Sequence, residues 1–111
     1  LEVAKSLGIP ITRTKICGGG AKSPLWCKMI ANILNLKVDK IESEEGPALG
    51  AAMLAAVGCG VYGSVEEIAE KMVKVVDTIE PDPAIAAKYD EKYAQFKQIY
   101  PALKPVFDVI K

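Results

Sequence analysis

A glycine-rich run has the clearest capacity for chemistry in this sequence. The run Cys17–Ser23 (CGGGAKS) follows a segment with strand-like alternation and precedes a helical pattern. Consecutive glycines leave backbone N–H groups uncovered, and the first turn of the following helix adds unpaired N–H groups and a partial positive charge. Lys22 places a mobile positive charge at the same point. These features predict a cradle for a phosphate or a nucleotide, with an ordinary tight glycine connection as the alternative.

The standard nucleotide fingerprints do not match this run. The P-loop pattern needs glycine where Ile16 and Ala21 stand, and the GxGxxG pattern needs glycine at Ser23. The glycines therefore indicate neither of these two folds. They leave open a nucleotide site of another lineage.

Composition excludes several other classes of function. The 111 residues include no histidine, which removes Ser-His-Asp and Cys-His catalysis. The three cysteines are odd in number and widely spaced: Cys17, Cys27 and Cys59. We interpret them as small buried side chains, and expect neither a metal site nor a disulfide framework. The setting is then expected to be reducing and cytoplasmic. A formal net charge of zero provides no basic patch, so we expect neither nucleic acid nor a membrane as a partner.

The elements that position the glycine run are readable from local signals. An amphipathic pattern that starts at Leu1 and closes at Gly8 predicts a helix that the sequence enters part-way, as in a piece of a longer chain. Alternation over Ile11–Cys17 predicts a strand. Ser23-Pro24 is a favoured N-cap and first-turn pair, which predicts a helix that ends at Asn35.

The middle of the chain continues this alternation of strand and helix. Lys37–Glu42 is weakly alternating and predicts a short edge strand. Gly46-Pro47 opens a second predicted helix that runs through Ala56 and is ended by Gly58 and Gly60. The segment Gly46–Val65 carries no charge, yet it is rich in alanine and glycine and is interrupted by further glycines. We therefore expect a buried helix closely packed through small residues such as Gly50, and no membrane span.

The last third of the chain is predicted to be mainly helical. Ser64 and Glu67 form a capping box at the start of a helix that runs to Met72, and Val73–Ile79 is expected to be extended. Asp82-Pro83 begins a last helix that ends at Pro101, with Pro105 preventing its continuation. The helix carries an aromatic stripe, interpreted as core or interface, whose members are Tyr89, Tyr93, Phe96 and Tyr100.

Two motifs in a fixed order carry a family resemblance. Gly18–Trp26 (GGGAKSPLW) followed by Glu45–Ala56 (EGPALGAAMLAA) resembles the C-terminal domain of FGGY carbohydrate kinases, and is most similar to the xylulose-phosphorylating members. The resemblance runs from Ile11 to the end, where Tyr93–Tyr100 is similar to the terminal helix of those members. It implies an α/β fold, a partial ribonuclease H-like domain of the actin, hexokinase and Hsp70 superfamily. Residues 1–111 would be the C-terminal part of the second kinase domain.

The resemblance implies an ATP-dependent sugar kinase that uses Mg²⁺, which is bound mainly by residues outside this chain. The alternatives are a kinase for another sugar or polyol, or a non-catalytic regulatory module with the same fold. Contact with the nucleotide is implied for Gly19, Gly20 and Ala21, and more loosely for Gly18, Lys22 and Ser23. Pro24 stands where some relatives have an adenine-contacting asparagine, and proline cannot donate that hydrogen bond.

No catalytic residue is assigned to this chain, and the chain alone is expected to be inactive. Its aspartates match none of the family's catalytic positions; those considered are Asp39, Asp77, Asp82, Asp90 and Asp108. We interpret Trp26 as core packing, and Glu44 and Glu45 as favourable charges before a helix N-terminus. The expected partners are ATP or ADP and the rest of the kinase chain. An incomplete sheet also predicts edge pairing or oligomerisation of the isolated chain, including a homodimer.

Overall fold

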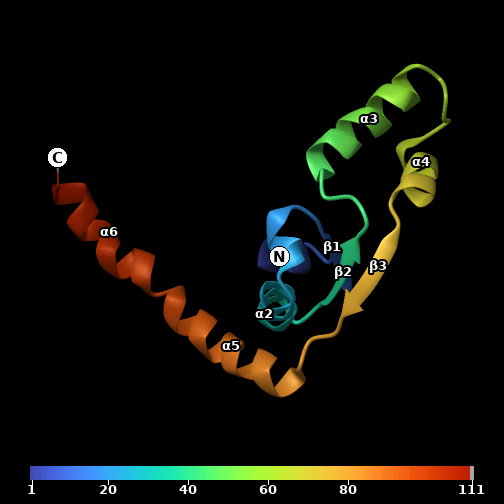
Figure 1. Ribbon diagram of the computed structural model, residues 1–111. Coiled ribbons are helices and arrows are strands. Elements are labelled where there is room, and N and C mark those ends of the chain that lie inside the picture. Colours follow the sequence, from blue (N-terminus) through green and yellow to red (C-terminus); the bar gives the residue numbers. More distant parts are fainter. Residues whose placement is uncertain (111) are drawn as a thin grey trace.

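The computed structural model describes residues 1–110 and shows a mixed α/β chain (Figure 1). The elements, in chain order, are α1 (Glu2–Ser6), β1 (Arg13–Ile16), the 3₁₀ helix η1 (Gly19–Lys22), α2 (Pro24–Leu34), β2 (Lys37–Ile41), α3 (Gly46–Gly58), α4 (Val65–Met72), β3 (Val75–Ile79), α5 (Pro83–Phe96) and α6 (Ile99–Val109). Each helix and strand expected from the sequence is present. Their boundaries, and the division of the last helix in two, differ from expectation.

A three-stranded sheet in the order β1-β2-β3 is the centre of the fold. Strands β1 and β2 are parallel, with Arg13 opposite Lys37, whereas β2 and β3 are antiparallel, with Val38 opposite Ile79. The prediction that Lys37–Glu42 is an edge strand is therefore wrong. Strand β2 is central because both neighbours pair with it, and pairing between distant segments cannot be read from local alternation.

The buried core gathers around β2 and α2. The apolar side chains with the least exposure are Ala21, Cys27, Ala31, Leu36, Val38, Ile41, Ile68 and Ala86. Helix α2 contacts β2, β3 and α5, so the helix that follows the glycine run is held firmly by the sheet and by a second helix. This places the glycine run at the end of β1, where its conformation is fixed by the elements on both sides.

Helices α5 and α6 form an arm that extends away from the sheet (Figure 1). The prediction of one helix that ends at Pro101 is wrong: α5 ends at Phe96, and α6 begins at Ile99. Pro101 then lies in the first turn of α6, where a backbone N–H has no partner within the helix, and Pro105 lies inside α6. The aromatic residues Tyr93, Phe96 and Tyr100 are exposed, so the interpretation as core fails within this chain.

Helix α3 also differs from expectation. The sequence predicts a buried, closely packed helix, but no residue of α3 is buried, and a Cβ added at Gly50 would meet no atom within 4 Å. Its principal contact within the described chain is α4. None of the helices within residues 1–110 combines the length and the apolar character that crossing a bilayer requires.

Several helix-end predictions are confirmed by the backbone. The hydroxyl oxygen of Ser23 accepts a hydrogen bond from the backbone N–H of Trp26 at 3.3 Å, and Asn35 ends α2 in the left-handed conformation, with φ of 49°. At α4, Ser64 Oγ accepts from the N–H of Glu67 at 3.2 Å. The reciprocal bond is shifted by one residue, because the Glu67 carboxylate accepts from the N–H of Gly63 at 3.0 Å.

Replacing Ser64 with alanine should lower the free energy of unfolding by about 1 kcal/mol, because α4 loses the acceptor for the Glu67 N–H. Urea unfolding of the two proteins measures the difference. Ser6→Ala is the matched control, since the Ser6 hydroxyl only donates to the Val3 carbonyl at the exposed end of α1. Equal losses for the two variants would show that the cap at α4 contributes nothing specific.

Candidate functional site: the glycine turn

The glycine turn, Gly18–Ser23, begins where β1 ends. Gly18 has a φ of 82°, a left-handed conformation that side chains other than glycine rarely adopt. The chain thereby leaves the strand direction and enters the 3₁₀ helix η1, in which the N–H of Ala21 bonds to the Gly18 carbonyl at 3.0 Å. Ser23 then caps α2. The turn is a defined structure held at both ends.

The sequence predicts two sets of free backbone donors, one in the glycines and one at the start of α2, and the structure largely removes the second. At α2, Pro24 has no N–H, and the N–H groups of Trp26 and Cys27 already bond to the side chain and carbonyl of Ser23. The start of α2 is thus largely satisfied. In η1, Gly19 and Gly20 occupy the first positions, which have no carbonyl acceptor within that helix.

Gly19 is the open position of the turn. A Cβ added at Gly19 would meet no atom within 4 Å, whereas one at Gly20 would lie 2.9 Å from Nε1 of Trp26. Ala21 is buried, and the Cys27 thiol donates to its carbonyl at 3.5 Å, so its methyl group belongs to the core. Gly18 also has open space at its Cβ position but is half-buried, so Gly19 is the glycine of the turn that combines exposure with open space.

The turn is joined to the start of α3 by two contacts. Lys22 Nζ lies 2.7 Å from Oε2 of Glu44, and this hydrogen bond and charge raise the pKa of the Lys22 ammonium above its usual value. The Cys17 sulfur packs directly against Gly46 at the start of α3. Sequence reasoning assigned Glu44 to the helix dipole and missed its pairing with Lys22. Spacing along the chain gives no signal for such a contact.

The cysteines and acidic residues form no second candidate site in the part of the chain that the structure describes. All three cysteines are free thiols; Cys27 is buried as predicted, whereas Cys17 and Cys59 are exposed, contrary to expectation. Within residues 1–110, no group of three or more His, Cys, Asp or Glu side chains is arranged to hold a metal ion.

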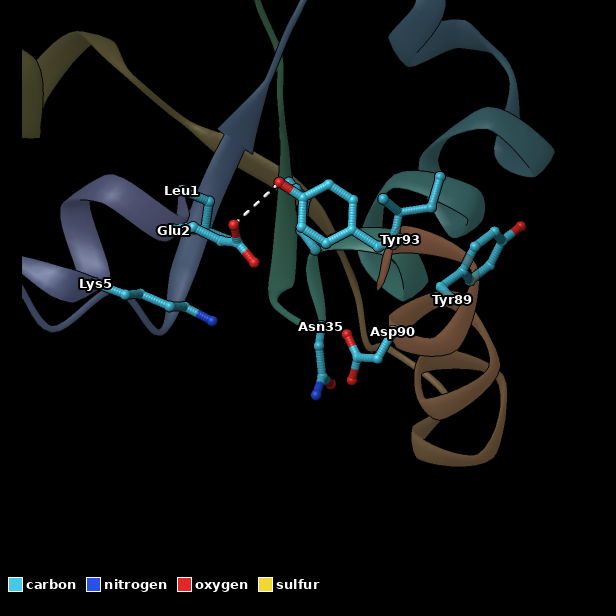
Figure 2. Close-up of a pocket in the computed structure, with 9 residues that line it drawn as sticks. Leu1, Glu2, Lys5, Asn35, Tyr89, Asp90 and Tyr93 are labelled. Carbon is cyan, nitrogen blue, oxygen red and sulfur yellow. Dashed lines mark hydrogen bonds between the residues drawn. The ribbon is translucent and has the colours of Figure 1, made fainter. Parts of the chain in front are cut away.

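A cavity of about 410 Å³ lies apart from the glycine turn, between α1, the end of α2 and α5 (Figure 2). Tyr93 donates to the Glu2 carboxylate at 3.1 Å across it, and Lys5, Asn35 and Asp90 surround it. The hydrogen bond to Glu2 raises the pKa of the Tyr93 hydroxyl. No residue of the glycine turn lines this cavity, so it is not part of the candidate site.

Comparison with known proteins decides the family. Residues 1–59, more than half of the chain, match the FGGY family of carbohydrate kinases, C-terminal domain. The chain belongs to this family. The matched segment runs from α1 to the end of α3, and so contains the whole glycine turn of this FGGY chain together with the Lys22–Glu44 and Cys17–Gly46 contacts.

Curated relatives of this FGGY chain include xylulose kinases and autoinducer-2 kinases. It is 37% identical to the xylulose kinase of Bacillus subtilis over 111 residues, which is 100% of the chain and 22% of that protein. It is 31% identical to an autoinducer-2 kinase of Escherichia coli over 99 residues, covering 89% of the chain and 19% of that protein. The chain thus spans about a fifth of the length of the curated relatives it matches.

Solved structures confirm the fold of the FGGY chain. The xylulose kinase from Rhodospirillum rubrum superposes with a TM-score of 0.71 at 31% identity, over 96% of this chain and 22% of that one. The gluconate kinase from Lactobacillus acidophilus gives a TM-score of 0.72 at 25% identity, over 83% and 18%. The predicted α/β class is confirmed, and the neighbours agree with an actin/hexokinase-like fold.

Proposed function

We propose that this chain is the ATP-binding, C-terminal part of the second domain of a longer FGGY kinase, with residues 1–111 contributing the adenosine side of the site. The observation that carries the proposal is the open backbone at Gly19 inside a segment that matches the family. Similarity to xylulose kinases along the whole chain favours xylulose as the phosphoryl acceptor. Similarity to gluconate and autoinducer-2 kinases keeps other polyols and sugar acids as alternatives.

The residues of the turn fit a nucleotide with its magnesium ion. The N–H groups of Gly19 and Gly20 have no carbonyl acceptor within η1, and the open space at the Cβ position of Gly19 lets a ligand approach the backbone closely. Lys22 is 62% exposed, so its ammonium group can reach a phosphate by leaving Glu44. Ser23 Oγ accepts from Trp26, which leaves its O–H free to donate. Bound ATP with Mg²⁺ would supply the phosphoryl group that is transferred.

The catalytic base and the sugar contacts are proposed to lie in other parts of the longer kinase. Phosphoryl transfer needs a base that receives the hydroxyl proton, and neither Glu44 nor Asp39 is free for this role. Glu44 is paired with Lys22, and Asp39 accepts hydrogen bonds from Arg13 and Thr78 within the sheet. We therefore expect the isolated chain to be inactive, and the full-length enzyme to act in the cytoplasm.

The test is a titration of the full-length polypeptide with ADP, followed by a screen for ADP release with ATP, Mg²⁺ and a panel of sugars. We expect saturable ADP binding and turnover with xylulose above that with gluconate, ribulose or glycerol. Absence of ADP binding would overturn the proposal. Binding without turnover on any acceptor would favour the regulatory module instead.

A further inference from the structure

We propose that Trp26 is a nucleotide-binding residue, whose indole ring forms an aromatic wall beside the glycine turn and stacks against the adenine base. This inference rests on the proposed function and adds a residue to it. The chain contains a single tryptophan. Sequence reasoning favoured simple core packing for this residue, but Trp26 is 50% exposed.

The ring of Trp26 is held against the turn. Trp26 lies in the first turn of α2, and its backbone N–H is bound to Ser23 Oγ at 3.3 Å. An added Cβ at Gly20 would lie 2.9 Å from Nε1 and 3.0 Å from Cδ1 of the ring. The ring edge therefore occupies the space that a side chain at position 20 would need, so Gly20 and Trp26 form one surface.

The exposed part of that surface suits a planar base. Trp26 is half exposed, and the nearby Gly19 is exposed with open space at its Cβ position. Stacking of a base on an aromatic side chain raises affinity by about 5- to 150-fold and does not depend on hydrogen bonds to the base edge. Stacking therefore offers a mode of base recognition that needs no backbone donor at Pro24, which has no N–H.

The neighbouring Leu25 is a matched comparison. It lies on the same turn of α2 and is 71% exposed, yet a Cβ at none of the glycines would contact it. An aliphatic side chain also offers no aromatic face for a base. The proposal thus distinguishes two exposed apolar residues on one helix end by their contact with the turn.

The test measures ADP and pyrophosphate binding to the full-length kinase and its Trp26→Ala, Trp26→Phe and Leu25→Ala variants. Trp26→Ala should weaken ADP binding by about 10-fold or more, in accord with the loss of one stacked base, and should leave pyrophosphate affinity within about 2-fold. Trp26→Phe should retain most of the ADP affinity, because phenylalanine keeps an aromatic face. Leu25→Ala should bind both ligands as the parent does.

Three outcomes separate this inference from the proposed function. If the parent protein does not bind ADP, the proposed function itself fails. If it does bind and Trp26→Ala binds equally well, the wall is absent while the nucleotide site stands. Equal losses for ADP and pyrophosphate would show that Trp26 only positions the turn. If Trp26→Ala does not fold, tryptophan fluorescence replaces it as the test. The difference in emission between the parent and Trp26→Phe reports on Trp26, and ADP should quench it whereas pyrophosphate should not. No quenching by ADP would overturn the proposal.

Discussion

Replacing Gly19 with valine should lower the affinity of the full-length kinase for ADP by about 100-fold or more, and replacing it with alanine by about 10-fold. A ligand held against the bare backbone leaves no room for a Cβ, and two further methyl groups at that carbon exclude it more completely. The Gly19→Ala protein should keep its fold, because the added Cβ meets no protein atom within 4 Å apart from its neighbours in the chain. Isothermal titration with ADP measures the loss, and thermal unfolding checks the fold.

Gly19 is more informative than the glycines on either side. Gly18→Ala would strain a backbone with φ of 82°, and any side chain at Gly20 would displace Trp26, so both variants disturb the protein before a ligand binds. Gly63→Ala is the matched control, since its Cβ would make an ordinary contact of 3.5 Å with the Glu67 carboxylate, between α3 and α4. An ADP affinity of Gly19→Val within about 3-fold of the parent would show that nothing binds over this residue.

Local signals in the sequence predicted the ends of the helices around the turn. Ser23 caps α2, Asn35 ends it in the left-handed conformation, and Gly8 follows α1 with a φ of 76°. These predictions succeed because a cap is an interaction between residues two to four positions apart. The local sequence therefore contains all the residues that form it. The start of α4 at Ser64 follows the same rule.

Features that depend on distant partners were not predictable in the same way. The central place of β2 depends on pairing with both β1 and β3. The exposure of α3 depends on which other elements pack against it, and the sequence of the helix does not reveal that. The division of α5 from α6 occurs at residues 97–98, whereas proline rules pointed to Pro101. A proline in the first turn of a helix is compatible with helix, so the stop signal was ambiguous.

The candidate site shows the same contrast. Its position after β1 followed from the glycines, but the 3₁₀ helix that begins at Gly19 and the capped start of α2 were not predicted, and they confine the free donors mainly to Gly19 and Gly20. The Trp26 ring lies against the backbone of Gly20, and the Lys22 and Glu44 side chains are paired, although neither pair is adjacent in the sequence. Sequence spacing therefore found the turn but not the side chains that shape it.

The second large effect is on stability. Replacing Asp39 with alanine should lower the free energy of unfolding by about 2 kcal/mol. Asp39 is 2% exposed at the centre of β2, and its Oδ1 accepts hydrogen bonds from the Arg13 guanidinium and the Thr78 hydroxyl, each at 2.8 Å. Alanine would leave both donors without this acceptor. The cost stays below that of a fully buried ion pair because the Arg13 side chain is largely exposed and can be solvated.

Urea unfolding at neutral pH measures this loss, and Asp77→Asn and Asp39→Asn complete the comparison. Asp77 is an exposed aspartate on the adjacent strand β3, and asparagine keeps the acceptor for the Thr78 N–H, so Asp77→Asn should be neutral. Asp39→Asn retains the shape and an acceptor oxygen but not the charge. Its decrease in the free energy of unfolding should therefore lie between those of Asp77→Asn and Asp39→Ala. A loss for Asp39→Ala no larger than that for Asp77→Asn would contradict the role of the buried carboxylate.

The pH dependence separates the charge of Asp39 from its shape. The hydrogen bond from Arg13, followed by that from Thr78, lowers the pKa of the Asp39 carboxyl against the opposing effect of burial. Because the folded pKa is lower than the unfolded value of about 3.9, the stabilisation is complete at higher pH and is lost as the pH falls through the folded pKa. The stability difference between the parent and Asp39→Asn should therefore be constant above about pH 5 and shrink in acid. If the parent and Asp39→Asn lose stability in parallel as the pH falls, the Arg13 charge contributes nothing through this carboxylate.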